Sequence, residues 1–129
     1  MSYDIDLLDP VTKEIIQFEN PHQIRGGTYA INGTTEASFN ITYNYSSVFY
    51  RTMGEKGIRS IYGLSGANSI SILKSAINQL SDDVDSDYWT CSEGNVKRAL
   101  YGLLAFDEMR PDGIWDGESN NLRFGGNWK

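Results

Sequence analysis

A strict alternation of apolar and polar side chains runs through residues 37–45, ASFNITYNY, and it constrains the fold more than any other stretch. Successive side chains of a β-strand point to opposite faces, so this alternation predicts a strand with one buried face. Aromatic and β-branched residues suit a pleated surface, and they fill most of the apolar positions. The apolar spacing changes after Ser46 and Ser47, which predicts a short helix with a serine cap that ends at Gly54.

The segment after this strand combines glycines, cations and tyrosines, a mixture that suits a ligand site. Glycines at this density allow positive φ angles and a close approach to a partner. Cationic side chains bind phosphate, and tyrosine rings stack on flat groups. The alternative is a buried connector whose charges are solvated, as is common in loops. The predicted ligand-binding residues are Arg51, Lys56 and Arg59 for phosphate, Arg25 as an assisting cation from a Gly-Gly turn, and Tyr50 or Tyr62 for stacking.

The distribution of charge decides which anions the chain can bind. With 11 Lys and Arg against 17 Asp and Glu, the formal net charge is −6, which argues against non-specific nucleic-acid binding. Residues 22–62 nevertheless hold four cations against Glu36 and Glu55, a net +2, so the rest of the chain sums to −8. A small anionic ligand at this segment is therefore compatible with an acidic protein.

Composition and cysteine content limit the classes of protein to which this chain can belong. Hydrophobic residues make up 40% and aromatic residues 12% of the 129 residues, which indicates a globular chain with its own core. We expect a single domain over residues 1–117, followed by an irregular aromatic tail over residues 118–129 that docks on the domain or on a second subunit. The lone Cys91 excludes an internal disulfide and fits a reducing compartment.

The N-terminus and the histidine count narrow the location and chemistry. The start MSYDIDLLDP lacks the features of a signal peptide, and no stretch approaches the roughly 18 apolar residues of a membrane span. We therefore expect a cytoplasmic protein without membrane contact. Because His22 is the only histidine, a metal cluster or a Cys-His nucleophile would depend on it alone. The sequence predicts no cofactor and no metal site.

The N-terminal part of the chain predicts a meander of about four strands. Two apolar runs flank Asp9-Pro10 within residues 3–18, and this turn chemistry predicts a hairpin. Residues 28–31 read as a third short strand, and Asn32-Gly33 is a strong hairpin signal into the long strand at residues 35–45. The exposed edges of such a sheet make a homo-oligomer possible.

The second half of the chain predicts two main helices. Apolar residues recur at helical spacing across residues 69–80, with Asn68 or Ser69 as the cap. Residues 92–109 repeat this pattern, Thr90 opens a T-x-x-E capping box, and a proline stops the helix. The expected fold class is α+β, a meandering antiparallel sheet with two main helices packed on one face.

Alternate aspartates between Asp82 and Asp87 invite comparison with a calcium loop. The spacing does not fit an EF-hand, because Tyr88 and Gly94 stand where that loop requires Gly and Glu. We interpret the segment as a solvated acidic connector, with Trp89 packed beneath the helices as an anchor.

Five phrases resemble a family of small uncharacterised proteins of Gram-positive bacteria and their phages: RGGTYAINGTTEASFNITYNYS, GEKGIRSIYGLSGANS, DDVDSDYW, EGNVKRAL and MRPDGIWDG. The likeness covers residues 1–117 and leaves the tail outside it. It carries no activity that can be transferred to this chain. What it implies is an origin on mobile elements, where small cytosolic proteins often act against host immunity.

Three functions remain open from the sequence. The first is sequestration, without cleavage, of a nucleotide-derived immune signal by the cations and tyrosines. The second is inhibition of a host defence protein, as anti-CRISPR proteins do, through acidic loops such as Asp82 to Asp87. The third is a small hydrolase with Asp112 and Asp116 as its acid–base pair, which ranks last because carboxylates in exposed turns are mostly solvated.

Overall fold

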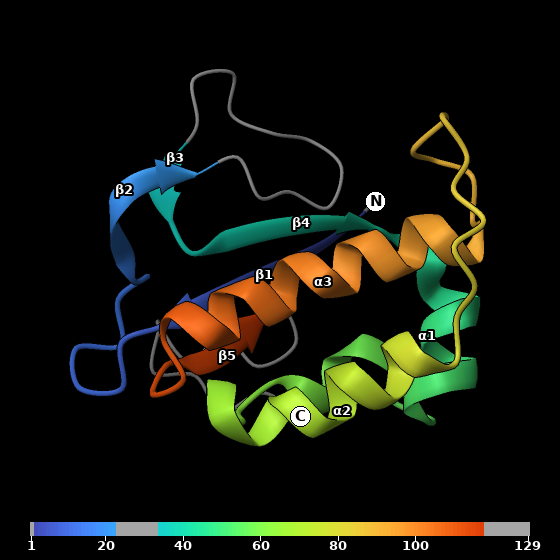
Figure 1. The fold of residues 1–129 in the computed structure, drawn as a ribbon. Helices are drawn as coiled ribbons and strands as arrows, with labels where there is room; N and C mark the ends of the chain where they lie inside the picture. The colour runs from blue at the N-terminus through green and yellow to red at the C-terminus, as the bar shows by residue number, and fades with distance from the viewer. Residues whose placement is uncertain (1, 23–33, 118–129) are drawn as a thin grey trace.

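The computed structural model describes residues 2–22 and 34–117, which form an α+β fold (Figure 1). A three-stranded antiparallel sheet has the order β4-β1-β5, and a second sheet pairs β2 with β3. The strands are β1 (Ser2–Leu8), β2 (Gln17–His22), β3 (Thr34–Glu36), β4 (Ser38–Thr42) and β5 (Ile114–Gly117). The helices are α1 (Ser46–Met53), α2 (Gly66–Asn78) and α3 (Glu93–Met109), with 3₁₀ turns η1 (Tyr43–Tyr45) and η2 (Gly57–Ile61). The predicted α+β class is confirmed.

The core lies between the three-stranded sheet and the helices. Alternate side chains of β1, from Tyr3 through Ile5 to Leu7, are buried, and Ile5 lies opposite Phe39 of β4. Helix α3 runs along β1 and β4 on one face of the sheet, and α2 packs beside α3 (Figure 1). None of the helices in the described ranges has both the length and the apolar character that a membrane crossing requires.

The strand order differs from the predicted meander. The Asp9-Pro10 turn forms, but the chain beyond it meets β1 only at the isolated bridge between Leu8 and Ile15. The return of the hairpin lies on the same edge of β1 as β4, because Leu7 N donates to Ala37 O while Leu7 O accepts from Ile16 N. Strand β5 takes the opposite edge, with Asp6 opposite Asp116. Pairing of β1 on both sides satisfies its backbone groups and leaves β2 to pair with β3. The predicted strand at residues 28–31 and its Asn32-Gly33 turn lie outside the described residues.

The predicted long strand at residues 35–45 is shorter than its alternation suggests. It consists of β3 and β4, and the chain turns into η1 at Tyr43. The Thr42 side chain accepts a hydrogen bond from Asn44 N, and the Thr42 N–H donates to Tyr88 Oη at 2.8 Å. Strand β4 ends here because Thr42 caps the turn η1, while Tyr45 still enters the core.

The helices confirm the predicted positions but not all of the predicted caps. Gly54 ends α1 with a φ of 91°, as expected, although the Ser46 hydroxyl bonds to Tyr43 O and caps nothing. Helix α2 begins at Gly66, three residues before the predicted start, because Ser65 caps it. In α3 the cap is Ser92 rather than Thr90.

The acidic connector, residues 81–92, is held to the start of α3 by Asn95. Its side chain bonds to Asp85 N, Asp87 O and Thr90 O at 3.0–3.1 Å. The prediction for Trp89 is wrong, because its side chain is 54% exposed. Tyr88 packs against the core instead, and its carbonyl oxygen accepts the Tyr45 hydroxyl.

Candidate functional site

A surface pocket of about 210 Å³ forms where β1, η1, α1 and η2 meet. Tyr3 lies at its buried end, with 2% of its surface exposed, and Tyr50 is 45% exposed at its mouth. The side chains that line the pocket come from distant parts of the sequence, and each is placed by one of these four short elements. The described lining residues are Tyr3, Tyr43, Ser46, Tyr50 and Arg59.

Arg59 is the cation of this pocket. The flanking residues Ile58 and Ile61 are fully buried, so the 3₁₀ turn η2 is anchored in the core. The Arg59 Cζ lies 5.0 Å from the centre of the Tyr3 ring and 5.9 Å from that of Tyr43. Both distances are within the range of cation–π attraction, which holds the guanidinium over the aromatic wall.

The hydroxyl groups of the pocket form an ordered chain. Ser46 Oγ donates to Tyr43 O at 2.7 Å, so it accepts the hydrogen bond that joins it to Tyr3 Oη at 2.6 Å. Burial raises the pKa of the Tyr3 phenol, which therefore keeps its proton at neutral pH. The pocket consequently presents the Arg59 guanidinium beside a neutral Tyr3 phenol.

Of the predicted ligand-binding residues that the structure describes, two meet in this pocket. Arg59 and Tyr50 line the pocket. Arg51 instead forms an ion pair with Glu93 at 3.1 Å, and Lys56 is an exposed residue at the N-cap of η2. The Tyr62 ring packs on Gly117 of β5. Arg25 lies outside the described residues.

Sequence reasoning missed Tyr3, Tyr43 and Ser46 as parts of the site. Tyr43 reads as one more apolar position of a strand, and only the end of β4 at Thr42 turns it toward the pocket. Tyr3 stands at the start of β1, next to Ile41 near the end of β4. These tyrosines could have been predicted as site residues from their positions at strand ends, where a phenol ring packs in the core while its hydroxyl reaches solvent.

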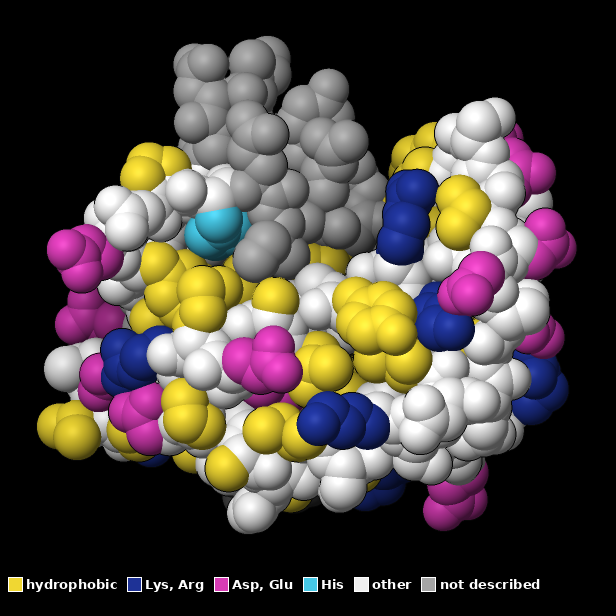
Figure 2. Space-filling view, in the orientation of Figure 1, with side chains coloured by type: hydrophobic (Ala, Val, Ile, Leu, Met, Phe, Trp, Pro, Cys, Tyr) yellow, Lys and Arg dark blue, Asp and Glu magenta, His cyan; other side chains and the backbone are white. Residues whose placement is uncertain are grey.

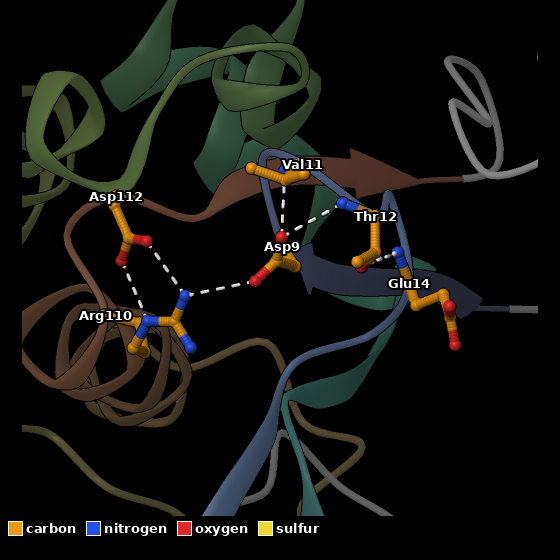
Figure 3. A network of polar contacts seen from close by, with 6 residues as sticks. All are labelled: Asp9, Val11, Thr12, Glu14, Arg110 and Asp112. Carbon is orange, nitrogen blue, oxygen red and sulfur yellow. Dashed lines mark hydrogen bonds and ion pairs between the residues drawn. The ribbon is translucent and has the colours of Figure 1, made fainter.

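The two carboxylates considered for a hydrolase have separate structural roles. Both oxygens of Asp112 accept hydrogen bonds from the Arg110 guanidinium at 2.8 Å, and Arg110 also reaches Asp9 at 3.5 Å (Figure 3). Asp116 is fully buried in β5, opposite Asp6. These contacts assign Asp112 to a surface ion-pair network and Asp116 to the sheet.

The described part of the chain shows no group of three or more His, Cys, Asp and Glu side chains that could hold a metal ion. Cys91 is exposed, with Sγ 4.0 Å from Ser47 Oγ, whereas His22 Nε2 bonds to Glu36 O at 2.7 Å. None of the described pocket-lining residues is a carboxylate, a histidine or a cysteine. The described side chains of the pocket therefore offer a cation and aromatic rings, but no general base.

A larger hollow of about 400 Å³ lies beside the turn that follows β1. Its lining includes Lys13, but Glu14 and Glu36 outweigh that cation. It also has no aromatic side chain among its described lining residues. Charge and aromatic lining both favour the smaller pocket as the anion site.

The fold and the pocket together define a small α+β protein with a cationic aromatic surface pocket. Comparisons with models of protein families, with curated proteins and with solved structures found no significant match.

Proposed function

We propose that this protein binds a small anionic ligand with a flat ring, as nucleotides have, and does not convert it. The observation that carries the proposal is the convergence of Arg59 with three tyrosines on one pocket. A guanidinium offers a planar fork of donors that matches phosphate, and a phenol ring offers a stacking face. The absence of a general base among the described lining residues favours binding over catalysis.

The size of the pocket indicates how such a ligand would bind. About 210 Å³ is below the roughly 300–1,000 Å³ of sites that engulf a drug-sized molecule. One phosphate near Arg59 and one ring against Tyr50 would fill it, and the remainder of the ligand would stay in solvent. Together with the resemblance to bacterial and phage proteins, this supports sequestration of a nucleotide-derived immune signal in the host cytoplasm.

Isothermal titration with AMP, cyclic AMP and ADP-ribose tests this proposal. The Arg59→Ala variant should bind the preferred probe about 10- to 100-fold more weakly, the usual loss for a charge-assisted contact. Arg51→Ala and Lys74→Ala are matched controls, because Arg51 pairs with Glu93 and Lys74 is exposed on α2. Both should stay within about twofold of the parent protein, since neither removes a contact of the pocket.

Native mass spectrometry supplies the second half of the test. The ligand should leave the denatured protein with its mass unchanged. Conversion of the probe, or equal binding by the parent protein and Arg59→Ala, would contradict the proposal.

A second candidate function is binding to a basic protein surface through the acidic connector. Val84 and Trp89 are 46% and 54% exposed beside carboxylates of the same segment. Figure 2 shows acidic side chains gathered along the edge of the molecule that the connector forms. An exposed aromatic among acids suits a partner with cations around an apolar recess, such as a host defence protein. A bacterial partner retained by the parent protein and by Arg59→Ala, but lost with Trp89→Ser, would favour this function over the first.

A further inference from the structure

A buried polar cluster joins α2, α3 and β5 and has no part in the proposed binding site. Asp107 of α3 has no exposed surface, and its Oδ2 lies 2.6 Å from Ser69 Oγ of α2. The same serine oxygen lies 2.8 Å from Trp115 Nε1 and 2.9 Å from Gly66 O. Three packed elements therefore meet at one hydroxyl group.

The hydrogen count at Ser69 favours a neutral Asp107. A hydroxyl has one proton to donate and two lone pairs to accept. The Trp115 indole N–H can only donate, and the Gly66 carbonyl can only accept. If Asp107 is protonated and donates to Ser69, the serine accepts twice and donates to Gly66, so all three contacts are hydrogen bonds. If Asp107 is ionised, Ser69 must donate its only proton to the carboxylate. Two acceptors, Ser69 Oγ and Gly66 O, then face each other without a hydrogen bond between them.

The N-terminus of α2 offers no further donor to an ionised Asp107. The four N–H groups of its first turn, residues 66–69, already have acceptors, which removes the usual means of holding an anion there. They are Gly113 O, Pro111 O, Ser65 Oγ and Ser65 O, at 2.7, 2.9, 3.1 and 3.0 Å in chain order. Asp107 Oδ1 has no hydrogen-bond partner in the described part of the chain, and a Cβ on Gly66 would lie 2.8 Å from it.

The charges around Asp107 also disfavour its ionisation. Glu108, the next residue of α3, adds a negative charge. Arg110 is engaged by Asp112 and Asp9, and Lys74 of α2 is exposed. On β5, the residue that follows Trp115 is Asp116, a buried carboxyl group and not a cation that could pair with Asp107. Among the ion pairs of the described residues, none involves Asp107.

We propose that Asp107 is a proton-sensitive contact whose neutral form holds α2, α3 and β5 together and whose ionisation loosens them. Burial raises the pKa of this carboxyl to about 7, although the nearby Ser69 hydroxyl and Trp115 indole N–H favour its ionised form and oppose the rise. The folded protein therefore holds a proton that the unfolded chain, with an ordinary value of 3.8, has released. This contribution to stability is fully present below about pH 3.8 and is lost as the pH rises through about 7.

The test compares thermal unfolding of the parent protein and Asp107→Asn between pH 5 and pH 8.5. Asparagine has nearly the same shape, stays neutral and can donate to Ser69 through its amide. The difference in melting temperature between the variant and the parent should grow with pH, and at pH 8 it should exceed its value at pH 5 by about 5 °C or more, because only the parent loses stability through this group. Glu108→Gln is the matched control, because it removes an adjacent exposed acid and leaves the Ser69 contacts in place. It should keep the parent's fall in stability with rising pH.

A spectroscopic titration of the parent protein reads the same group directly. The Asp107 carboxyl ¹³C resonance, assigned in the parent protein through its own backbone correlations, should titrate near pH 7, and the Trp115 indole N–H resonance should shift with the same midpoint. This measurement decides the question even if the variant fails to fold. A carboxyl that titrates below pH 5, or an equal loss of stability with pH in Asp107→Asn, would overturn the proposal.

Discussion

At Gly94, a hydrogen atom in place of a side chain allows the connector to lie on the first turn of α3. A Cβ there would meet Asp83 C at 2.5 Å and Val84 N at 2.6 Å, and backbone atoms cannot move aside as side chains do. Gly94→Ala should destabilise the protein by about 1–3 kcal/mol, although alanine is intrinsically the better helix former by roughly 1 kcal/mol. Urea unfolding measures the difference. Ser71→Ala, at an exposed position of α2, is the control and should be neutral or slightly stabilising.

The connector as a whole depends on one amide. Asn95 is buried, and its side chain bonds to three backbone groups of residues 85–90, so no regular secondary structure is needed to fix this loop. Asn95→Ala should leave those groups unpaired, at a cost of about 1–3 kcal/mol, and the loop should open locally. Hydrogen exchange should speed up in residues 83–91 while the centre of α3 stays protected. Asn78→Ala, at the exposed end of α2, should change neither region, and equal exchange in both variants would argue against this role.

Elements with strong local signals could be predicted from the sequence, and elements defined by distant partners could not. The periodicity of α3 and the glycine that ends α1 are local, and both predictions agree with the structure. Strand β5 is only four residues long between turn-forming residues, and it exists because β1 offers it an edge. The candidate site follows the same rule. The local composition predicted a ligand site in the segment that contains Arg59, but it could not predict that Tyr3 lies next to Arg59 in the fold. The sequence also could not show that Tyr88, rather than its neighbour Trp89, packs against the core. That choice depends on the hydrogen bonds of Tyr88 with Thr42 and Tyr45, which are distant in the sequence.

The pH dependence of unfolding belongs to the whole molecule, because its carboxyl groups act in opposite directions. Backbone N–H groups of Thr12 and Ser81 lower the pKa of Asp9 and Glu93, and Arg110 lowers that of Asp112. The stability from these three groups is present above their ordinary values of 3.8 to 4.5 and is lost as the pH falls below them. The raised pKa of Asp107, about 7, removes stability as the pH rises.

The melting temperature should therefore pass through a maximum at about pH 4 to 4.5, near the ordinary carboxyl values, and should fall from there toward pH 7. Differential scanning calorimetry between pH 3 and pH 8 measures it. Asp107→Asn should flatten the fall above the maximum, while Asp9→Ala should lower the melting temperature above about pH 4 and so make the rise on the acid side smaller. A melting temperature that rises steadily from pH 4 to pH 7 in the parent protein would mean that Asp107 is ionised in the fold, and that its contact with Ser69 holds the helices without its proton.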